Sequence, residues 1–389
     1  MAGVDAIVSA RRLAIAVAVL FFVNGMVYGN WIPRIPELKD SLGLSNTSLG
    51  FTLLGGAIGG IVGSLVAGRL MSRIGSCRLL LGTIVPLPLI MAMIPFVGEA
   101  WLLLVMLSLI GVGDAGADLA MNAQGVIAQE ALGRSIMNRL HGFWSLGFAS
   151  GTIVGSVSAG LRLDFRLQVM VVAGLLLTTA LLVSQSLARN DPPPTPRSSA
   201  HGARHLGGVV APLIIVGGAA IALEGAPNEW AALLMRDDFG VGAWAGFGSV
   251  AFGAGMLIGR LSGDHILEWL GQQRMFRSAL TLIMVGVVAT VSTDIVPLAF
   301  IGLFVFGLGQ SVIFPYLYLV AARTPGISAG MGLGVMLVGL RVGGIATALS
   351  MGVISNAVDV RFALGVVSGV AIVLLLLASG SLSRRVNTV

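Results

Sequence analysis

The sequence predicts an all-α polytopic membrane protein with twelve transmembrane helices in two pseudo-symmetric six-helix bundles. Hydrophobic residues make up 56% of the 389-residue chain and charged residues only 10%, whereas soluble domains carry about 25% charge. Continuous apolar runs recur along the whole chain, and its two halves share short motifs. Because the charges are too few to cover a water-facing surface, lipid must be the main solvent.

Twelve apolar runs are separated by charged residues, prolines or glycines, and a helix of about 20 residues suffices to cross a bilayer. The runs are continuous rather than alternating, which favours helices over a barrel, the other structure that satisfies its backbone hydrogen bonds in lipid. The expected helices cover residues 12–33, 46–68, 79–97, 100–128, 140–161, 167–187, 208–234, 243–263, 276–293, 296–322, 329–355 and 362–382.

The first run follows Arg11 and Arg12, as the apolar part of a secretory signal peptide would. No small-residue cleavage site follows it, and Trp31 continues the apolar segment. We therefore interpret this run as a first span that is retained.

The basic residues predict the orientation, because cytoplasmic loops of membrane proteins are enriched in Lys and Arg. With the N-terminus inside, most of the 23 basic residues fall in inside segments. Those expected outside are Arg34, Lys39, Arg162, Arg166, Arg236 and Arg361. We expect both termini in the cytoplasm and the chain in a bacterial inner (plasma) membrane. This topology accounts for the net charge of +6 without nucleic acid binding.

The long polar segment 188–207 predicts a cytoplasmic linker between an N-terminal bundle, 1–187, and a C-terminal bundle, 208–389. Motifs recur across this division: the Gly-Arg-Leu sequence of Gly68–Leu70 returns as Gly259–Leu261, nearly half a chain length later. Paired halves of this kind are a common plan of transport proteins.

Glycines at four-residue spacing let helices pack closely, and such sets lie in every third expected helix. The sets are Gly55, Gly59 and Gly63; Gly147, Gly151 and Gly155; Gly255, Gly259 and Gly263; and Gly330 with Gly334. This periodicity indicates three-helix units, although glycine is also simply frequent, at 55 residues.

The connection after the second expected helix reads Gly68-Arg69-Leu70-Met71-Ser72-Arg73-Ile74-Gly75, followed by Arg78. It resembles the major facilitator superfamily signature Gly-x-Leu-x-Asp-Arg-x-Gly. Ser72 occupies the position where that family has an acid that stabilises the outward-open state. The resemblance therefore implies that this state is less strongly stabilised here. The gating residues that it implies are Gly68, Arg69, Arg73, Gly75 and Arg78, with Gly259, Arg260 and Asp264 in the second half.

Three further segments are Asp118–Gln124, His141–Gly147, and Glu224–Gly225 with Glu229–Trp230. They resemble a narrower group, the fucose-permease-like and YbjJ-type bacterial permeases. The superfamily resemblance covers nearly the whole chain and implies a transporter, with proton coupling in the best-known members.

The sequence offers no metal-ligand cluster, nucleophile triad or phosphate-binding loop, so we expect no enzyme activity, no metal and no cofactor. Its four histidines are scattered, and its single cysteine, Cys77, is expected to be inert.

Three acids are expected within the membrane, where a charge costs roughly 2.5–3.5 kcal/mol on insertion scales. Asp114 and Asp118 lie one turn apart in the helix expected at 100–128, so they share a face. Glu224 lies near the middle of the helix expected at 208–234. We interpret these carboxyl groups as candidates for proton coupling; the alternative is a structural ion pair or a neutral, hydrogen-bonded acid.

Candidate substrate ligands are the polar groups expected at membrane depth: Asn24, Asn30, Glu224, Gln310 and Arg341. An arginine in mid-span cannot deprotonate, so Arg341 must meet a carboxylate or a bound anion. A permanent pair with Glu224 or with an aspartate of 100–128 is the structural alternative.

The sequence thus favours a secondary active transporter of a small, sugar-like or organic solute. We expect it to be coupled to protons and to work in the bilayer as a monomer. Proton-driven efflux of drugs or metabolites fits the apolar helices equally well. A non-transporting receptor or scaffold is the alternative from another class, suggested by Ser72 in the signature.

Overall fold

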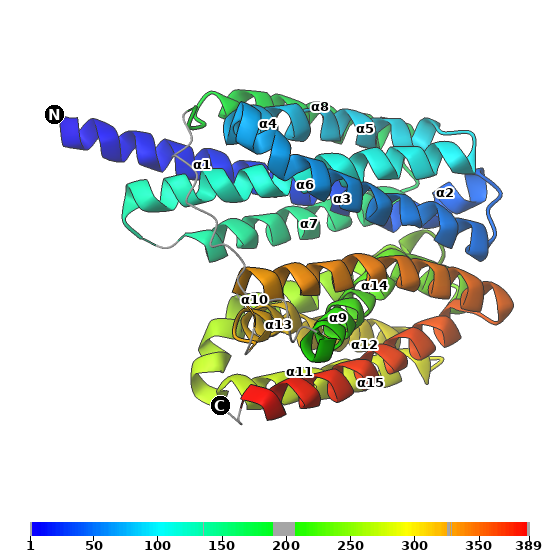
Figure 1. Ribbon diagram of the computed structural model, residues 1–389. Coiled ribbons are helices and arrows are strands. Elements are labelled where there is room, and N and C mark those ends of the chain that lie inside the picture. Colours follow the sequence, from blue (N-terminus) through cyan, green and yellow to red (C-terminus); the bar gives the residue numbers. More distant parts are fainter. Residues whose placement is uncertain (1, 135, 190–206, 325–326, 328, 387–389) are drawn as a thin grey trace. The chain divides into compact units, whose positions relative to one another are not determined.

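The computed structural model describes residues 2–134, 136–189, 207–324, 327 and 329–386, and Figure 1 shows helices throughout these ranges. The first half of the chain forms α1 (Ala2–Gly29), η1 (Ile32–Arg34), α2 (Ile35–Ser41), α3 (Asn46–Ile74), α4 (Ser76–Ile84), α5 (Pro86–Met93), η2 (Ile94–Phe96), α6 (Ala100–Leu132), α7 (Met137–Gly160) and α8 (Phe165–Ser184).

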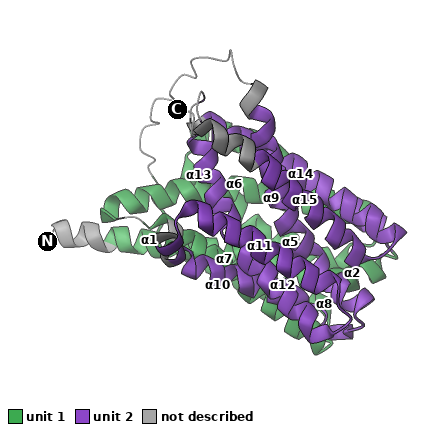
Figure 2. Ribbon diagram, turned by 90° about the horizontal axis from the view of Figure 1, so that it is seen from below, with its two compact units in different colours: residues 1–43, 52–195 green, residues 44–51, 196–389 purple. Residues whose placement is uncertain are grey.

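The second half forms α9 (Gly207–Leu233), η3 (Leu234–Asp238), η4 (Gly242–Trp244), α10 (Phe247–Leu270), α11 (Gln272–Val291), α12 (Val296–Gln310), α13 (Ile313–Ala322), α14 (Ala329–Ala357) and α15 (Val360–Val386). Figure 2 colours the two compact units of the chain. Unit 1 comprises Met1–Gly43 and Thr52–Thr195, and unit 2 comprises Leu44–Phe51 and Pro196–Val389. Most of the expected linker, 190–206, lies outside the described residues.

Eleven helical segments of the described chain are long and apolar enough to cross a membrane. α7 is not among them, although a twelfth span was expected there. This helix has 24 residues and is rich in glycine and serine, which lower its hydropathy and give it a surface suited to packing against α1. The all-helical membrane fold predicted from the sequence is confirmed.

Several expected helix ends were wrong. α3 continues past Gly68 to Ile74, and α10 continues past Gly263 to Leu270, because single charges near the end of an apolar run do not interrupt a helix. Conversely, the span expected at 79–97 is divided into α4 and α5 just before Pro86, which has no backbone N–H to donate.

Close backbone contacts confirm three of the four glycine sets. An added Cβ on Gly55 would fall inside 3.0 Å of α6, and one on Gly255 inside 3.0 Å of α12, a separation that real Cβ atoms essentially never show. In the last set, the expectation for Gly334 was wrong, because an added Cβ would meet nothing within 4 Å, and the surroundings of Gly330 lie outside the described residues. Gly339 and Gly343 of the same helix instead meet the backbone of α9. These contacts pack helices of one unit together without intervening side chains.

Candidate functional site

A first polar array links three helices of unit 1. Asn24 of α1 donates from Nδ2 to Asp114 Oδ1 of α6 at 3.0 Å, and its Oδ1 accepts from Trp144 Nε1 of α7 at 2.7 Å. Asn24 is only 1% exposed, whereas Asp114 and Trp144 are half-buried. Since an indole nitrogen can only donate, it fixes which way the amide points. The amide therefore connects an indole to an intramembrane carboxyl group.

A second array of the same design lies one helical turn further along α6. Asn122 donates from Nδ2 to Asp118 Oδ1 at 2.9 Å, and its Oδ1 lies 3.2 Å from His141 Nε2 of α7. The ring of Phe21 packs edge-on against His141, with centroids 5.0 Å apart. Asp118 and His141 are exposed. Each array thus runs from ring to amide to carboxyl group, and the second presents both of its ends to the surface.

The close approach of α1 and α7 positions both arrays. A Cβ on Gly25 would fall inside 3.0 Å of the Trp144 carbonyl oxygen, and one on Gly147 inside 3.0 Å of the Phe22 carbonyl oxygen. Only glycine permits this backbone separation, which brings the Trp144 indole to the Asn24 amide.

Asn30, expected at a substrate site, lies in a buried cluster of unit 1. Gln168 of α8 donates from Nε2 to Asn30 Oδ1 at 2.6 Å, and Asn30 Nδ2 lies 3.7 Å from Met91 Sδ. Arg34, only 2% exposed, donates to Gln168 Oε1 at 3.1 Å and to the Leu163 carbonyl at 2.8 Å. Because Asn30 finds its partners inside the bundle, this geometry favours a packing role for it.

A third candidate group lies in unit 2. Glu224 of α9 forms an ion pair with Arg260 of α10, with 3.9 Å between Oε2 and Nη2. Gln310 of α12 donates from Nε2 to the Ala220 carbonyl of α9 at 3.1 Å. Within the described part of the chain, Glu224 Oε2 and Gln310 Oε1 are buried and accept no hydrogen bond. Buried acceptors without donors are costly, so a donor from a ligand or a water would be stabilised there.

The helical bundles and their intramembrane polar groups agree with a match to the Major Facilitator Superfamily model over residues 17–328. The chain belongs to this superfamily. Its family and fold are those of multi-pass membrane transporters, which are not enzymes, and the family match leaves the substrate open.

Similar proteins agree with this assignment to the superfamily (MFS). An uncharacterized MFS-type transporter of Yersinia pestis is 29% identical over 382 residues, which cover 94% of each chain. A crystal structure of a mutant of the nucleoside transporter NupG matches with a TM-score of 0.74 at 14% identity, covering 95% of this chain and 99% of that one. A bacterial homologue of the human lysosomal transporter Spinster matches at 0.69 and 15% identity, covering 96% of both chains. The narrower resemblance to fucose-permease-like proteins stays a prediction.

The MFS signature segment lies on two helix ends. Gly68, Arg69 and Arg73 lie in the last turns of α3, and Arg78 lies in the first turn of α4. Gly75 joins the two helices with φ +83°, a conformation that side chains with a Cβ rarely adopt. The Ser72 hydroxyl donates to the Arg69 carbonyl at 2.8 Å, so the residue that replaces the family acid bonds within its own helix.

The second-half copy of the signature lies inside α10. A Cβ on Gly259 would meet Ser311 of the α12–α13 corner, and Arg260 reaches Glu224 rather than a loop. The side chain of Asp264 lies outside the described residues. Arg260 therefore belongs to the polar group of unit 2.

Arg341 lies near the middle of α14 and is half-buried. The sequence left open an ion pair with Glu224 or with an aspartate of 100–128. The carboxylate of Glu224 is paired with Arg260. Anion recognition by Arg341 stays a prediction.

Sequence reasoning missed the residues that join these groups. Asn122, His141 and Trp144 were noticed only within a family resemblance, and Gln168 was not noticed. Their common signal is an amide or polar ring inside an otherwise apolar helix. In the described ranges, no group of three or more His, Cys, Asp or Glu side chains is arranged so that it could hold a metal ion.

Proposed function

We propose that this MFS transporter is a proton-coupled secondary active transporter of a small polar solute that works by alternating access. The observation that supports the proposal is the pair of ring–amide–carboxyl arrays, which give Asp114 and Asp118 of the long apolar helix α6 specific polar partners. Ionisable groups at such depth are rare and usually serve an ion or substrate pathway.

Asp118 is the proposed proton carrier. It is exposed, whereas Asp114 is half-buried and bonded to the buried Asn24. A proton must enter and leave during each cycle, so the carrier needs access to water. Asp114 and Glu224 are the second choices for the coupling group.

The proposed substrate ligands Glu224, Gln310 and Arg341 belong to unit 2. Asn24 remains a separate candidate ligand in unit 1. Glu224 Oε2 and Gln310 Oε1 are buried acceptors suited to the hydroxyl or amino donors of a sugar-like or other small organic solute. Arg341 would recognise an anionic group on it. Because NupG is a nucleoside transporter, nucleosides belong among the substrates to test.

The proposed setting is the inner membrane of a bacterium, with both termini in the cytoplasm. The lysine and arginine distribution supports this orientation. A single chain contains both units, so we propose that the monomer is functional.

The test is counterflow and proton uptake in proteoliposomes, with a panel of sugars, sugar acids, nucleosides and hydrophobic amines. We expect Asp118→Asn to abolish proton movement and to leave exchange of substrate for substrate intact. Asp164→Asn is the matched control, because it removes one charge from an exposed helix N-cap that asparagine fills equally well. Proton movement that persists in Asp118→Asn would refute the assigned carrier, and counterflow absent for the whole panel with folded protein would point to a receptor.

A further inference from the structure

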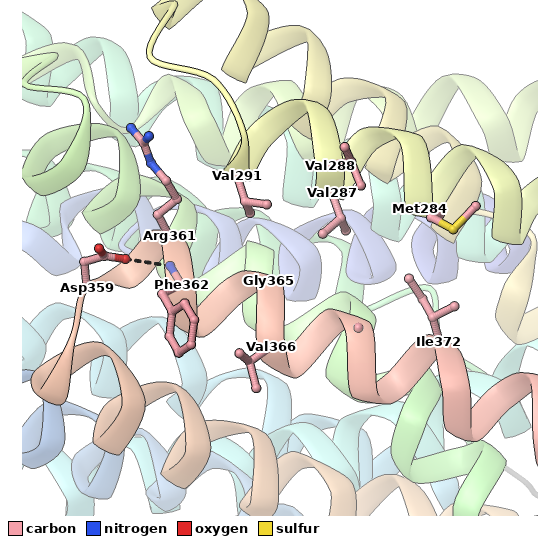
Figure 3. Close-up of a pocket in the computed structure, with 11 residues that line it drawn as sticks. Met284, Val287, Val288, Val291, Asp359, Arg361, Phe362, Gly365, Val366 and Ile372 are labelled. Carbon is pink, nitrogen blue, oxygen red and sulfur yellow. Dashed lines mark hydrogen bonds between the residues drawn. The ribbon is translucent and has the colours of Figure 1, made fainter.

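An apolar groove runs between α11 and α15 of unit 2 and has charged side chains at one end only (Figure 3). Its volume is about 510 Å³. The apolar lining is Met284, Val287, Val288, Val291, Phe362, Val366 and Ile372, and the charged end is Asp359 with Arg361. Met284, Val288 and Phe362 are each at least half exposed, so the groove opens on the outside of the bundle.

The groove exists because two lining positions of α15 have no side chain. A Cβ on Gly365 would make ordinary contact with Val291 at 3.7 Å, and one on Gly369 would meet nothing within 4 Å. Larger residues would therefore fit at Gly369 without moving a neighbour, which makes this glycine suitable for filling the groove.

The length of the groove matches one leaflet of a bilayer. Eleven residues separate Arg361 from Ile372, which corresponds to about 16 Å of helix. Half of a hydrocarbon core is about 15 Å thick. An acyl chain lying along α15 would therefore place its headgroup at the charged end, and in lipid an apolar groove of this depth has no water to fill it.

Several charged side chains surround the charged end of the groove, where a lipid headgroup would lie. The Arg361 guanidinium pairs with Asp294 at 2.7 Å, and the Arg361 backbone N–H donates to Asp238 at 2.7 Å. Asp359 caps α15, since its Oδ1 accepts from the Phe362 N–H at 2.6 Å. The Arg361 guanidinium thus lies close to the carboxyl groups of Asp238, Asp294 and Asp359, and Asp294 is 94% exposed.

We propose that this groove is a binding site for a phospholipid with a primary ammonium headgroup. The acyl chain lies between α11 and α15, the phosphate meets Arg361, and the ammonium group donates to Asp359 and Asp294. A phosphate alone would gain from Arg361 but would be repelled by the surrounding carboxylates, so an anionic lipid fits less well. A quaternary ammonium has no N–H to donate, so a choline lipid fits less well too.

The test is native mass spectrometry of the purified full chain, after exchange into detergent containing phosphatidylethanolamine, phosphatidylcholine or phosphatidylglycerol with identical acyl chains. We expect one tightly retained lipid per chain, with phosphatidylethanolamine preferred roughly two- to fivefold, as expected for one partly exposed ion pair. Gly369→Leu should abolish retention of that lipid, whereas Val370→Leu, an exposed neighbour outside the groove, should not.

Asp359→Asn tests recognition of the headgroup separately from binding of the acyl chain in the groove. Asparagine caps a helix as well as aspartate does, so the fold and the groove stay intact while one carboxylate is lost. We expect this variant to retain lipid but to lose the preference for phosphatidylethanolamine. Equal binding of all three lipids by the parent protein, a preference for phosphatidylglycerol, or retention unchanged in Gly369→Leu would each overturn the proposal.

Discussion

Replacing Asn24 by leucine tests whether the first polar array holds unit 1 together. The change keeps the size of the side chain but removes both hydrogen bonds that its amide makes, one to Asp114 and one from Trp144. Asn122→Leu is the matched comparison, because it removes the same kind of amide from the second array, whose carboxyl group and ring are exposed.

The expected magnitude follows from the difference in burial. Hydrogen bonds between membrane helices contribute about 0.6 kcal/mol on average and up to about 1.7 kcal/mol. Asn24 is 1% exposed, so each of its two hydrogen bonds should contribute near the upper end of this range. We therefore expect Asn24→Leu to lower the free energy of unfolding by about 1–3 kcal/mol. At the exposed Asp118 and His141, water can replace the amide of Asn122. We therefore expect Asn122→Leu to lower the free energy of unfolding by less than about 1 kcal/mol.

The assay is thermal denaturation in detergent, followed by the amount of monodisperse protein that remains after heating. Asn24→Leu should lower the midpoint by several degrees and Asn122→Leu by much less. A double-mutant cycle with Trp144→Phe should be less than additive, since the indole donor loses its acceptor in either single variant. Equal shifts for the two leucine variants, or strict additivity with Trp144→Phe, would refute the reasoning.

Three structural predictions and one functional prediction follow from the same contacts. Gly147→Val should destabilise the protein by about 1–3 kcal/mol through overpacking against α1, while Gly142→Ala on the same helix, with nothing within 4 Å of its Cβ, should be neutral in the same melt. Arg34→Lys should also lower the melting temperature, because an ammonium group cannot reproduce the fork of bonds made by this buried guanidinium; an unchanged midpoint would contradict it. Gly75→Ala should cost about 1–3 kcal/mol, since φ +83° is strained for alanine, as measured by the same denaturation. His141→Gln should slow proton-coupled transport, because glutamine can still meet the Asn122 amide but has no ring nitrogen to take up a second proton; an unchanged transport rate would contradict this role.

The existence of the helices could be predicted from the sequence because the bilayer imposes it. A polar backbone in lipid must bond to itself, so every long apolar run has to be helical. Helix ends could not be predicted as well, because nothing in a run of residues such as Gly259–Leu261 distinguishes a helix end from a polar group that faces another helix. Arg260 was therefore expected to be a gating residue, whereas it forms an ion pair with Glu224 of α9.

Partners across helices were beyond the sequence for a geometric reason. Spacing along one helix shows that Asp114 and Asp118 share a face, but not which neighbour that face meets. Asn24 is 90 residues from Asp114 in the chain, and Asn30 is 138 residues from Gln168. Only the packed bundle specifies these pairs.

The two arrays differ in the ring at one end, which is an indole in the first and an imidazole in the second. Both place an asparagine between a ring nitrogen and a carboxyl group, and in both the amide nitrogen is directed at the carboxyl group. The amide oxygen can only accept, so His141 Nε2 must carry a hydrogen, just as Trp144 Nε1 does. An indole has no further site for a proton, whereas the imidazole of His141 has Nδ1. The ring of the first array therefore has no site for a further proton, whereas the ring of the second array has one at Nδ1. That contrast, together with the exposure of the second array, is why we propose Asp118 rather than Asp114 as the carrier.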